Sequence, residues 1–227
     1  MRSWTHASAG LGAAAWLALL SALPSDIELR TVALLLLLAV LVCVPLGLAL
    51  VATPDRAGRH PWPYRVARRS QLGAALLVVG SYFLPAGLPA AALATPWLAF
   101  TGLVALFGLG RLLSRGVGSV EETCIDAGLL YLPVGGAWLV LSRLGANPLG
   151  FGDTIVLLTA VHFHYAGFVA PILAGLAGRS LWPSQRGARR AFRLVAVGVI
   201  AGPPLLAAGI TPTARWNRSR RCSWRAA

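Results

Sequence analysis

Two histidines and a tyrosine interrupt an apolar run, TAVHFHYAGFVAPILAG, at residues 159–175. His162, His164 and Tyr165 have side chains that can transfer protons or bind a polar solute, and histidine can also ligate a metal ion. Such side chains are costly in lipid, and within a membrane they commonly mark substrate and proton pathways. These three residues are therefore the first candidates for a functional site.

A second group of polar residues lies in the preceding segment, GSVEETCIDAGLLYLPVGGAW, at residues 118–138. Ser119 and Glu122 have the spacing of a capping box, and Glu121 lies where the helix dipole favours an anion. Helix capping alone can therefore explain both glutamates. Asp126 lies one turn further along, on the face of Glu122, and a carboxylate at that depth needs a partner or a wet cavity.

The depths of these residues suggest that the two groups meet. Counted from Asp153, His162 and His164 lie roughly 14–17 Å from the outer surface, at 1.5 Å per residue. In a hydrocarbon core of about 30 Å, Asp126 lies about 20 Å and Tyr131 about 12 Å from the same surface. Because consecutive antiparallel spans are commonly neighbours, we predict a carboxylate–imidazole cluster near the midplane.

Helix geometry limits how this cluster can form. Residues two apart point in nearly opposite directions, so His162 and His164 cannot both face one small site on a regular helix. Unwinding near Pro171, which frees the Gly167 carbonyl, is one way to bring them together. Otherwise one histidine faces the preceding span and the other faces a different helix. His162 and Tyr165, three apart, share a face of a regular helix.

The elements that must position these residues are membrane spans. The chain of 227 residues is 57% hydrophobic and 12% charged, whereas soluble domains carry about 25% charged residues. A span needs about 20 apolar residues, and seven segments qualify: 7–23, 30–52, 70–88, 90–112, 122–144, 153–177 and 192–211. The sequence predicts an all-α, polytopic transmembrane helix bundle that forms one domain over residues 1–211. The short break LPAGLPA predicts a tight hairpin between the third and fourth spans.

The arginines between the spans predict the orientation. Three alternate loops are rich in arginine: Arg56, Arg59, Arg65, Arg68 and Arg69; Arg111 and Arg115; Arg179, Arg186, Arg189 and Arg190. Because such loops stay in the cytoplasm, the N-terminus is predicted to be cytoplasmic. The tail PTARWNRSRRCSWRAA, residues 212–227, carries five arginines and would lie outside. We therefore expect this tail to be disordered or to result from a frameshift.

The expected partners follow from the same pattern. The lipid bilayer surrounds the spans, and the net charge of +13 belongs to the loops that orient them, so nucleic-acid binding is not expected. Gly198 with Gly202, and Ala174 with Gly178, are small residues four apart that favour close helix packing. These faces can pack within the chain, against a membrane partner or against a second copy.

No cofactor is evident from the motifs. The cysteines match no zinc spacing or disulfide framework, and no GxSxG, Walker or Rossmann motif is present. The GFGD at residues 150–153 resembles a signature of intramembrane aspartyl proteases, but Asp153 and Asp126 are predicted to lie about 20 Å apart. Histidine and carboxylate side chains are common ligands of divalent metals, so His162 or His164 could hold such an ion together with Asp126 and Glu122. The spacing of these residues matches no known metal-binding signature.

The two polar segments together resemble a known family. VEETCIDAGLLYLPVGGAWLVLSRLG and GFGDTIVLLTAVHFHYAGFVAPILAGLAGR are similar to the YndJ-like family of bacterial integral membrane proteins, over residues 120–179. The HFHYAGF core is the most specific part of the likeness. The resemblance implies a multi-pass protein of the bacterial inner membrane and a role for the residues already named, Glu121, Glu122, Asp126, His162, His164 and Tyr165. It implies no substrate.

Three functions are consistent with these residues. The first, which we favour, is a small transporter or permease in which a midplane cluster of histidines and Asp126 handles protons or a polar solute. The second is a membrane enzyme in which histidine acts as general base or metal ligand on a lipid-soluble substrate. The third is a non-catalytic partner subunit whose polar residues only hold helices together.

Overall fold

The computed structural model describes residues 2–23, 29–52, 60–180 and 186–223, with side chains from His6 to Ile210. This part of the chain is all-α, with helices joined by short connections. Its elements form seven helical rods. Five rods are single helices: α1 (Arg2–Ala22), α4 (Trp62–Ser81), α5 (Leu88–Arg115), α6 (Val120–Leu144) and α9 (Arg186–Ser223). Two rods consist of three elements end to end: α2 (Arg30–Leu38), η1 (Ala39–Cys43) and α3 (Val44–Val51), which lie between α1 and α4 in the chain, and α7 (Asp153–His162), η3 (Phe163–Val169) and α8 (Ala170–Arg179), which lie between α6 and α9. A short 3-10 turn, η2 (Pro148–Gly150), links α6 to α7.

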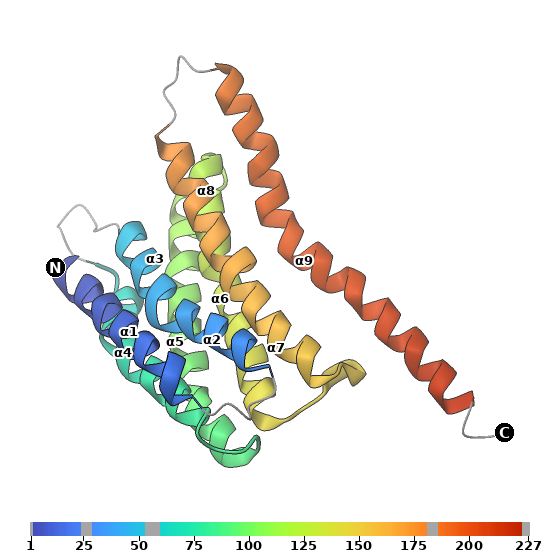
Figure 1. Ribbon diagram of the computed structural model, residues 1–227. Coiled ribbons are helices and arrows are strands. Elements are labelled where there is room, and N and C mark those ends of the chain that lie inside the picture. Colours follow the sequence, from blue (N-terminus) through green and yellow to red (C-terminus); the bar gives the residue numbers. More distant parts are fainter. Residues whose placement is uncertain (1, 24–28, 53–59, 181–185, 224–227) are drawn as a thin grey trace.

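Five of these rods are long and apolar enough to cross a membrane, namely 30–51, 88–115, 120–144, 153–179 and 187–210. The apolar part of α1 is shorter, at His6–Ala22, and α4 contains several arginines. The predicted bundle of about seven helices is therefore confirmed. Figure 1 shows successive rods running in alternating directions, with α1–α8 gathered into one bundle and α9 diverging from it toward its C-terminal end.

The third span differs from its predicted bounds. Residues 70–88 were expected, whereas α4 extends from Trp62 to Ser81. The helix begins early because Pro63 suits a first turn, where no N–H bond is needed, and because arginine is a good helix former. The connection to α5 covers residues 82–87, as expected for a tight hairpin. The guanidinium of Arg143 in α6 donates to the carbonyls of Ser81 and Leu84 at 2.9 and 2.8 Å, which fastens this hairpin to the bundle.

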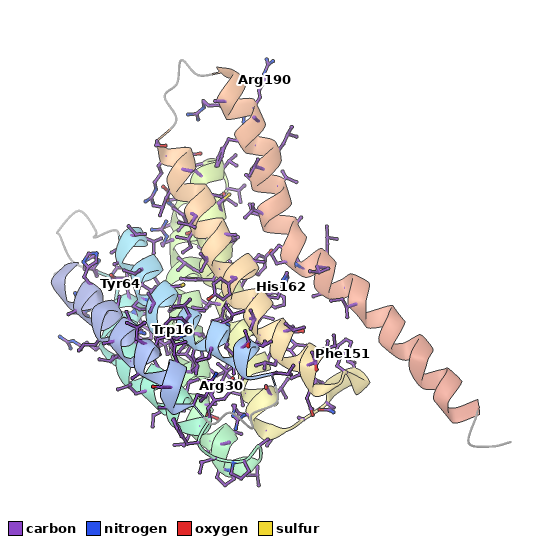
Figure 2. The ribbon with its side chains drawn as sticks, in the orientation of Figure 1. Trp16, Arg30, Tyr64, Phe151, His162 and Arg190 are labelled. Atoms are coloured by element: carbon purple, nitrogen blue, oxygen red, sulfur yellow. The ribbon has the colours of Figure 1, made fainter. Side chains whose placement is uncertain are left out.

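The rod formed by α2, η1 and α3 is the most buried of the five apolar rods, with 67% of its apolar window buried. Side chains from four neighbouring elements donate hydrogen bonds to its backbone carbonyls: Trp16 to Leu34, Tyr165 to Leu35, Gln71 to Val40, Tyr64 to Leu48 and Arg111 to Val51. Trp16 and Tyr64 are labelled beside this rod in Figure 2. A backbone carbonyl in lipid must find a donor within the protein, so these bonds lock the rod in place.

Prolines explain where several of these donors are needed. The wide turn η1 leads into Pro45, which has no N–H to offer the Val40 carbonyl five residues earlier, and Gln71 Nε2 donates to that carbonyl at 3.2 Å. In α9, Pro204 leaves the Ile200 carbonyl without its helical donor, and the Tyr131 hydroxyl donates to it at 2.7 Å. At both places a side chain of a neighbouring helix donates to the carbonyl that the proline leaves free, as an apolar environment requires.

The α9 helix packs weakly on the bundle. Only 11% of its apolar window is buried. A Cβ on Gly178 of α8 would clash with the ring of Phe192, so the two helices touch closely there. Gly198 and Gly202, the predicted packing pair, have no atom within 4 Å of a built Cβ. Their small faces are therefore not used within the described part of this chain. The helix continues through most of residues 212–227 as far as Ser223.

Candidate functional site

Five charged side chains from three helices meet at one end of the bundle. Asp126 accepts a hydrogen bond from Arg111 Nε at 2.8 Å and pairs with Arg115. Glu122 accepts from Arg111 Nη2 at 2.8 Å, from Arg179 Nε at 2.6 Å and from Arg115. We call these five residues the charge cluster. Its two carboxylates face three guanidinium groups, so the cluster carries a net charge of +1.

Local sequence explains this arrangement. Arg111 and Arg115 are four apart at the end of α5, and Glu122 and Asp126 are four apart at the start of α6, so each pair lies on one helix face. The connection of residues 116–119 is short, which brings these two faces together. Ser119 caps α6 by accepting the Glu122 N–H at 3.4 Å, as the capping box predicts.

The third arginine of the cluster comes from α8, because α8 packs very closely on the start of α6. A Cβ on Gly175 would clash with the Glu121 carbonyl. Glu121 itself lies outside the cluster, where it lines a cavity of about 150 Å³ together with Arg189 and Arg193. Of the two adjacent glutamates, only Glu122 therefore joins the three arginines.

A cavity of about 710 Å³ opens beside the charge cluster. We call it the arginine pocket. It lies between the start of α4, the last turns of α5, the start of α6 and the end of α8, and its lining is Pro61, Trp62, Pro63, Leu106, Phe107, Gly110, Arg111, Ser114, Arg115, Glu122 and Arg179. Arg115 and Arg179 remain 35% and 29% exposed, whereas Arg111 is 7% and Asp126 1% exposed. Two guanidinium groups are therefore accessible from the pocket.

The histidines lie elsewhere, and each faces a different helix. His164 is fully buried; its Nε2 accepts from Trp97 Nε1 at 3.1 Å, and its Nδ1 lies 2.7 Å from the Ala160 carbonyl. His162 Nε2 lies 3.4 Å from the Pro203 carbonyl of α9, and Figure 2 shows His162 on the side of the bundle that faces this helix. The prediction that the two histidines cannot share one small site on a helix is confirmed.

The segment around the histidines is a wide helical turn, η3, at residues 163–169. This wide turn lies just before Pro171, where unwinding was one way to bring the histidines together, but here it does not do so. A wide turn rotates less per residue than an α-helix, so Tyr165 does not share the face of His162 as its spacing suggested. Its hydroxyl donates to the Leu35 carbonyl at 2.9 Å. Tyr131 reaches α9 instead.

The structure does not bring Asp126 to the histidines. A Cβ on Gly135 would lie 2.7 Å from His164 Nδ1, so His164 lies level with Gly135. Nine residues of α6 separate Gly135 from Asp126, which corresponds to about 14 Å along the helix. The expected meeting assumed spans limited to the 30 Å of hydrocarbon. However, α6 has 25 residues and the α7–α8 rod 27, or about 38 and 40 Å, so Asp126 lies nearer the end of the bundle.

The same separation bears on metal binding. In the described part of the chain, no group of three or more histidine, cysteine, aspartate or glutamate side chains is placed to hold a metal ion. The suggested ligands are divided: Glu122 and Asp126 are bonded to arginines, His164 lies beside Gly135, and His162 contacts α9. In the sequence, Arg111, Arg115 and Arg179 indicate only the orientation of the spans. One pattern in the sequence does indicate the charge cluster: Arg111 and Arg115 are four residues apart, Glu122 and Asp126 are four residues apart, and only a short turn separates the two pairs.

Comparison with known proteins agrees with this architecture. The sequence model of the family described as YndJ-like protein matches residues 34–216. The uncharacterized membrane protein YndJ of Bacillus subtilis (strain 168) is 37% identical over 115 residues, which are 51% of this chain and 20% of that relative. The matched region thus spans only one fifth of the relative's length. No solved structure matches the chain. Because the family model matches most of its length, the chain belongs to the YndJ-like family. Together with the five helices long and apolar enough to cross a membrane, this shows that it is an integral membrane protein.

Proposed function

We propose that the chain forms the membrane part of a small transporter or permease for an anionic solute, in the inner membrane of a bacterium. The solute's charged end would be held in the arginine pocket, at the end of the bundle that the arginine distribution assigns to the cytoplasm. The site therefore differs from the midplane histidine cluster suggested by the sequence.

One observation carries this proposal: the charge cluster borders an open cavity instead of being sealed in the core. A cluster that served only stability would be expected to bury all its charges or to leave them on a solvated surface. Here Asp126 and Arg111 are buried, while Arg115 and Arg179 stay about one-third exposed beside a cavity of about 710 Å³. Arginine binds carboxylate and phosphate groups well, because its planar fork donates two parallel hydrogen bonds.

Exchange of partners supplies a mechanism. Arg115 bonds both Glu122 and Asp126, and Arg179 bonds Glu122 through two nitrogens. An entering anion competes with these carboxylates for the two exposed guanidinium groups. Binding would then loosen the contact of α8 with α6, because Arg179 is the residue through which α8 reaches the cluster. In this way, solute binding is linked to a change in helix packing.

The histidines do not carry this proposal. His164 is buried against Trp97, with both ring nitrogens engaged. His162 contacts the backbone of α9. These contacts support a role in holding helices together, since a general base or metal ligand needs a free nitrogen directed at its substrate or metal.

Uptake into proteoliposomes tests the proposal. The purified full chain would be reconstituted, and uptake of radiolabelled inorganic phosphate, sulfate and lactate compared with that of a cation, rubidium. We expect uptake of at least one anion above empty liposomes and none of rubidium. Arg115→Gln should lower that uptake about tenfold, because it removes one charge-assisted hydrogen bond worth roughly 1.5 kcal/mol, and about 1.4 kcal/mol corresponds to a factor of ten.

The matched control is Arg69→Gln, which removes the same charge from an exposed position of α4 outside the pocket lining. This variant should transport like the unaltered chain. Equal losses in both variants would show a general effect of charge on the liposomes. Anion uptake that is insensitive to Arg115→Gln, or absent for every probe, would overturn the proposal.

A further inference from the structure

We infer that the arginine pocket binds an anionic amphiphile, with a phosphate head group at Arg115 and Arg179 and a hydrocarbon chain along α5. The inference rests on the proposed function, because it names the class of solute. It follows from the shape of the pocket, from its level in the membrane and from its charge.

The pocket is elongated along one helix face. Its α5 lining residues form two rows of i,i+4 spacing, one of Leu106, Gly110 and Ser114 and the other of Phe107, Arg111 and Arg115. The charged ends of both arginines point to the start of α6, whereas the other row has small residues at its middle and end. A Cβ on Gly110 would meet no atom within 4 Å. The pocket thus has a charged end and an apolar end.

The apolar end is long enough for part of an acyl chain. Nine residues separate Leu106 from Arg115, or about 14 Å along α5. Leu106 and Phe107 lie at the end away from Arg115, and Pro63 of α4 adds to the apolar lining. Leu106 is half exposed, so its side chain faces lipid as well as the pocket. A small inorganic anion would use none of this apolar lining.

The charged end lies at the level of lipid head groups. The α5 helix has 28 residues, or about 42 Å, and is therefore longer than the hydrocarbon core of about 30 Å. Arg115 is its last residue. Trp62, which is 57% exposed, lines the same pocket from the first residue of α4. Exposed tryptophan is enriched at the boundary between hydrocarbon and head groups.

The charge favours an anionic head group over a zwitterionic one. Three guanidinium groups face two carboxylates, which leaves one positive charge for a ligand to neutralise. Basic pockets between transmembrane helices on the cytoplasmic side commonly bind anionic lipid head groups. Arg115 and Arg179 come from different helices and both retain exposed surface, so one phosphate can contact both.

Lipid retention measured by native mass spectrometry tests the inference. The purified full chain would be given phosphatidylglycerol or phosphatidylcholine with identical acyl chains, with inorganic phosphate as competitor. We expect about tenfold stronger retention of phosphatidylglycerol, which corresponds to one charge-assisted hydrogen bond. Arg115→Gln should remove this preference. Arg179→Gln, on another helix, should reduce it independently, and Arg69→Gln should leave it unchanged.

A second variant and its matched control test the part of the pocket that would hold the acyl chain. Gly110→Leu fills the open middle of the pocket and should lower phosphatidylglycerol retention about tenfold, as the loss of a well-packed apolar segment implies. Gly102→Leu is the control, because a Cβ at Gly102 also meets no atom within 4 Å and this glycine lies outside the lining. Thermal unfolding of both variants would show whether each remains folded.

The outcomes separate the two proposals. Equal retention of both lipids, or loss only in Gly102→Leu, would overturn the amphiphile inference. If Gly110→Leu has no effect while inorganic phosphate competes and anion uptake depends on Arg115, the pocket binds a free anion and only the transport proposal stands. If lipid retention follows the predicted pattern but no anion is taken up, the amphiphile site stands and the transport proposal fails.

Discussion

Replacing Asp126 with asparagine should destabilise the protein through its arginines. The carboxylate is 1% exposed and pairs with Arg111 and Arg115, so the amide keeps the shape but leaves buried positive charge without its partner. Breaking a buried ion pair from one side costs about 3–5 kcal/mol. Arg111 still pairs with Glu122 in this variant, and Arg115 is partly exposed to solvent. The free energy of unfolding should therefore fall by an amount near the lower limit, about 3 kcal/mol.

Thermal unfolding in detergent measures this loss. For a chain of this size, 1 kcal/mol shifts Tm by about 2–4 °C, so Asp126→Asn should lower Tm by about 6–12 °C. Asp153→Asn is the matched control, because Asp153 is exposed at the first turn of α7. Its interaction with the helix dipole is worth at most about 1 kcal/mol, so Tm should fall by less than about 4 °C.

A double-mutant cycle identifies the partner of Asp126. Combined with Arg115→Gln, Asp126→Asn should show a coupling energy of about 1–3 kcal/mol, because the two side chains are bonded. Combined with His164→Asn, the two effects should add within about 0.5 kcal/mol, since the residues lie at different levels of the bundle. A coupling above about 1 kcal/mol between Asp126 and His164 would refute the separation of the two groups and restore the midplane cluster.

Three further predictions concern the contacts around the histidines. Gly135→Ala should lower the free energy of unfolding by about 1–3 kcal/mol, because the new Cβ would lie 2.7 Å from His164 Nδ1. The control Gly102→Ala, at an open position of α5, should leave the free energy of unfolding unchanged or raise it by up to about 1 kcal/mol. Equal effects of the two variants in thermal unfolding would contradict the packing described. Trp97→Phe removes the only donor observed at His164 Nε2 among the described residues, and should cost about 1–2 kcal/mol in the same assay. Tyr131→Phe removes the donor to the Ile200 carbonyl of α9, and should increase hydrogen exchange of α9 amides around that residue while leaving α5 unchanged; uniform exchange across both helices would argue against a local attachment.

Much of the fold could be predicted from hydropathy, because a span in lipid must be a helix of limited length and apolar composition. Five of the seven predicted segments overlap their helices closely, and the last, 192–211, lies within the longer α9. The third helix, α4, begins earlier than predicted, because its first turns contain arginines that hydropathy assigns to a loop. The start of α4 depends instead on the pair of prolines at Pro61 and Pro63, which suit the first turn of a helix whatever its hydropathy.

The site was harder to predict because it depends on axial register. Asp126 was correctly identified as a buried carboxylate in need of a partner, yet its partners were assigned by depth. Treating α6 as 30 Å long, when its 25 residues extend over about 38 Å, misplaces Asp126 by about 8 Å relative to the outer surface, which is enough to change which side chains meet. Trp97, the partner of His164, had no signal in the sequence beyond being one of several apolar aromatics. Side-chain partners across helices depend on packing that hydropathy does not encode.

The support of the α2–α3 rod by side-chain donors has a consequence for biosynthesis. Its segment is the most apolar of the five candidate spans in the described residues, with a mean hydropathy of 3.1, and it leaves the ribosome early. Trp16, which precedes it, can donate to Leu34 at once, but Gln71 and Tyr165 are translated later. Insertion of this segment must therefore precede its final docking, and the backbone around Val40 stays without its lasting partner until the following helices have entered the bilayer.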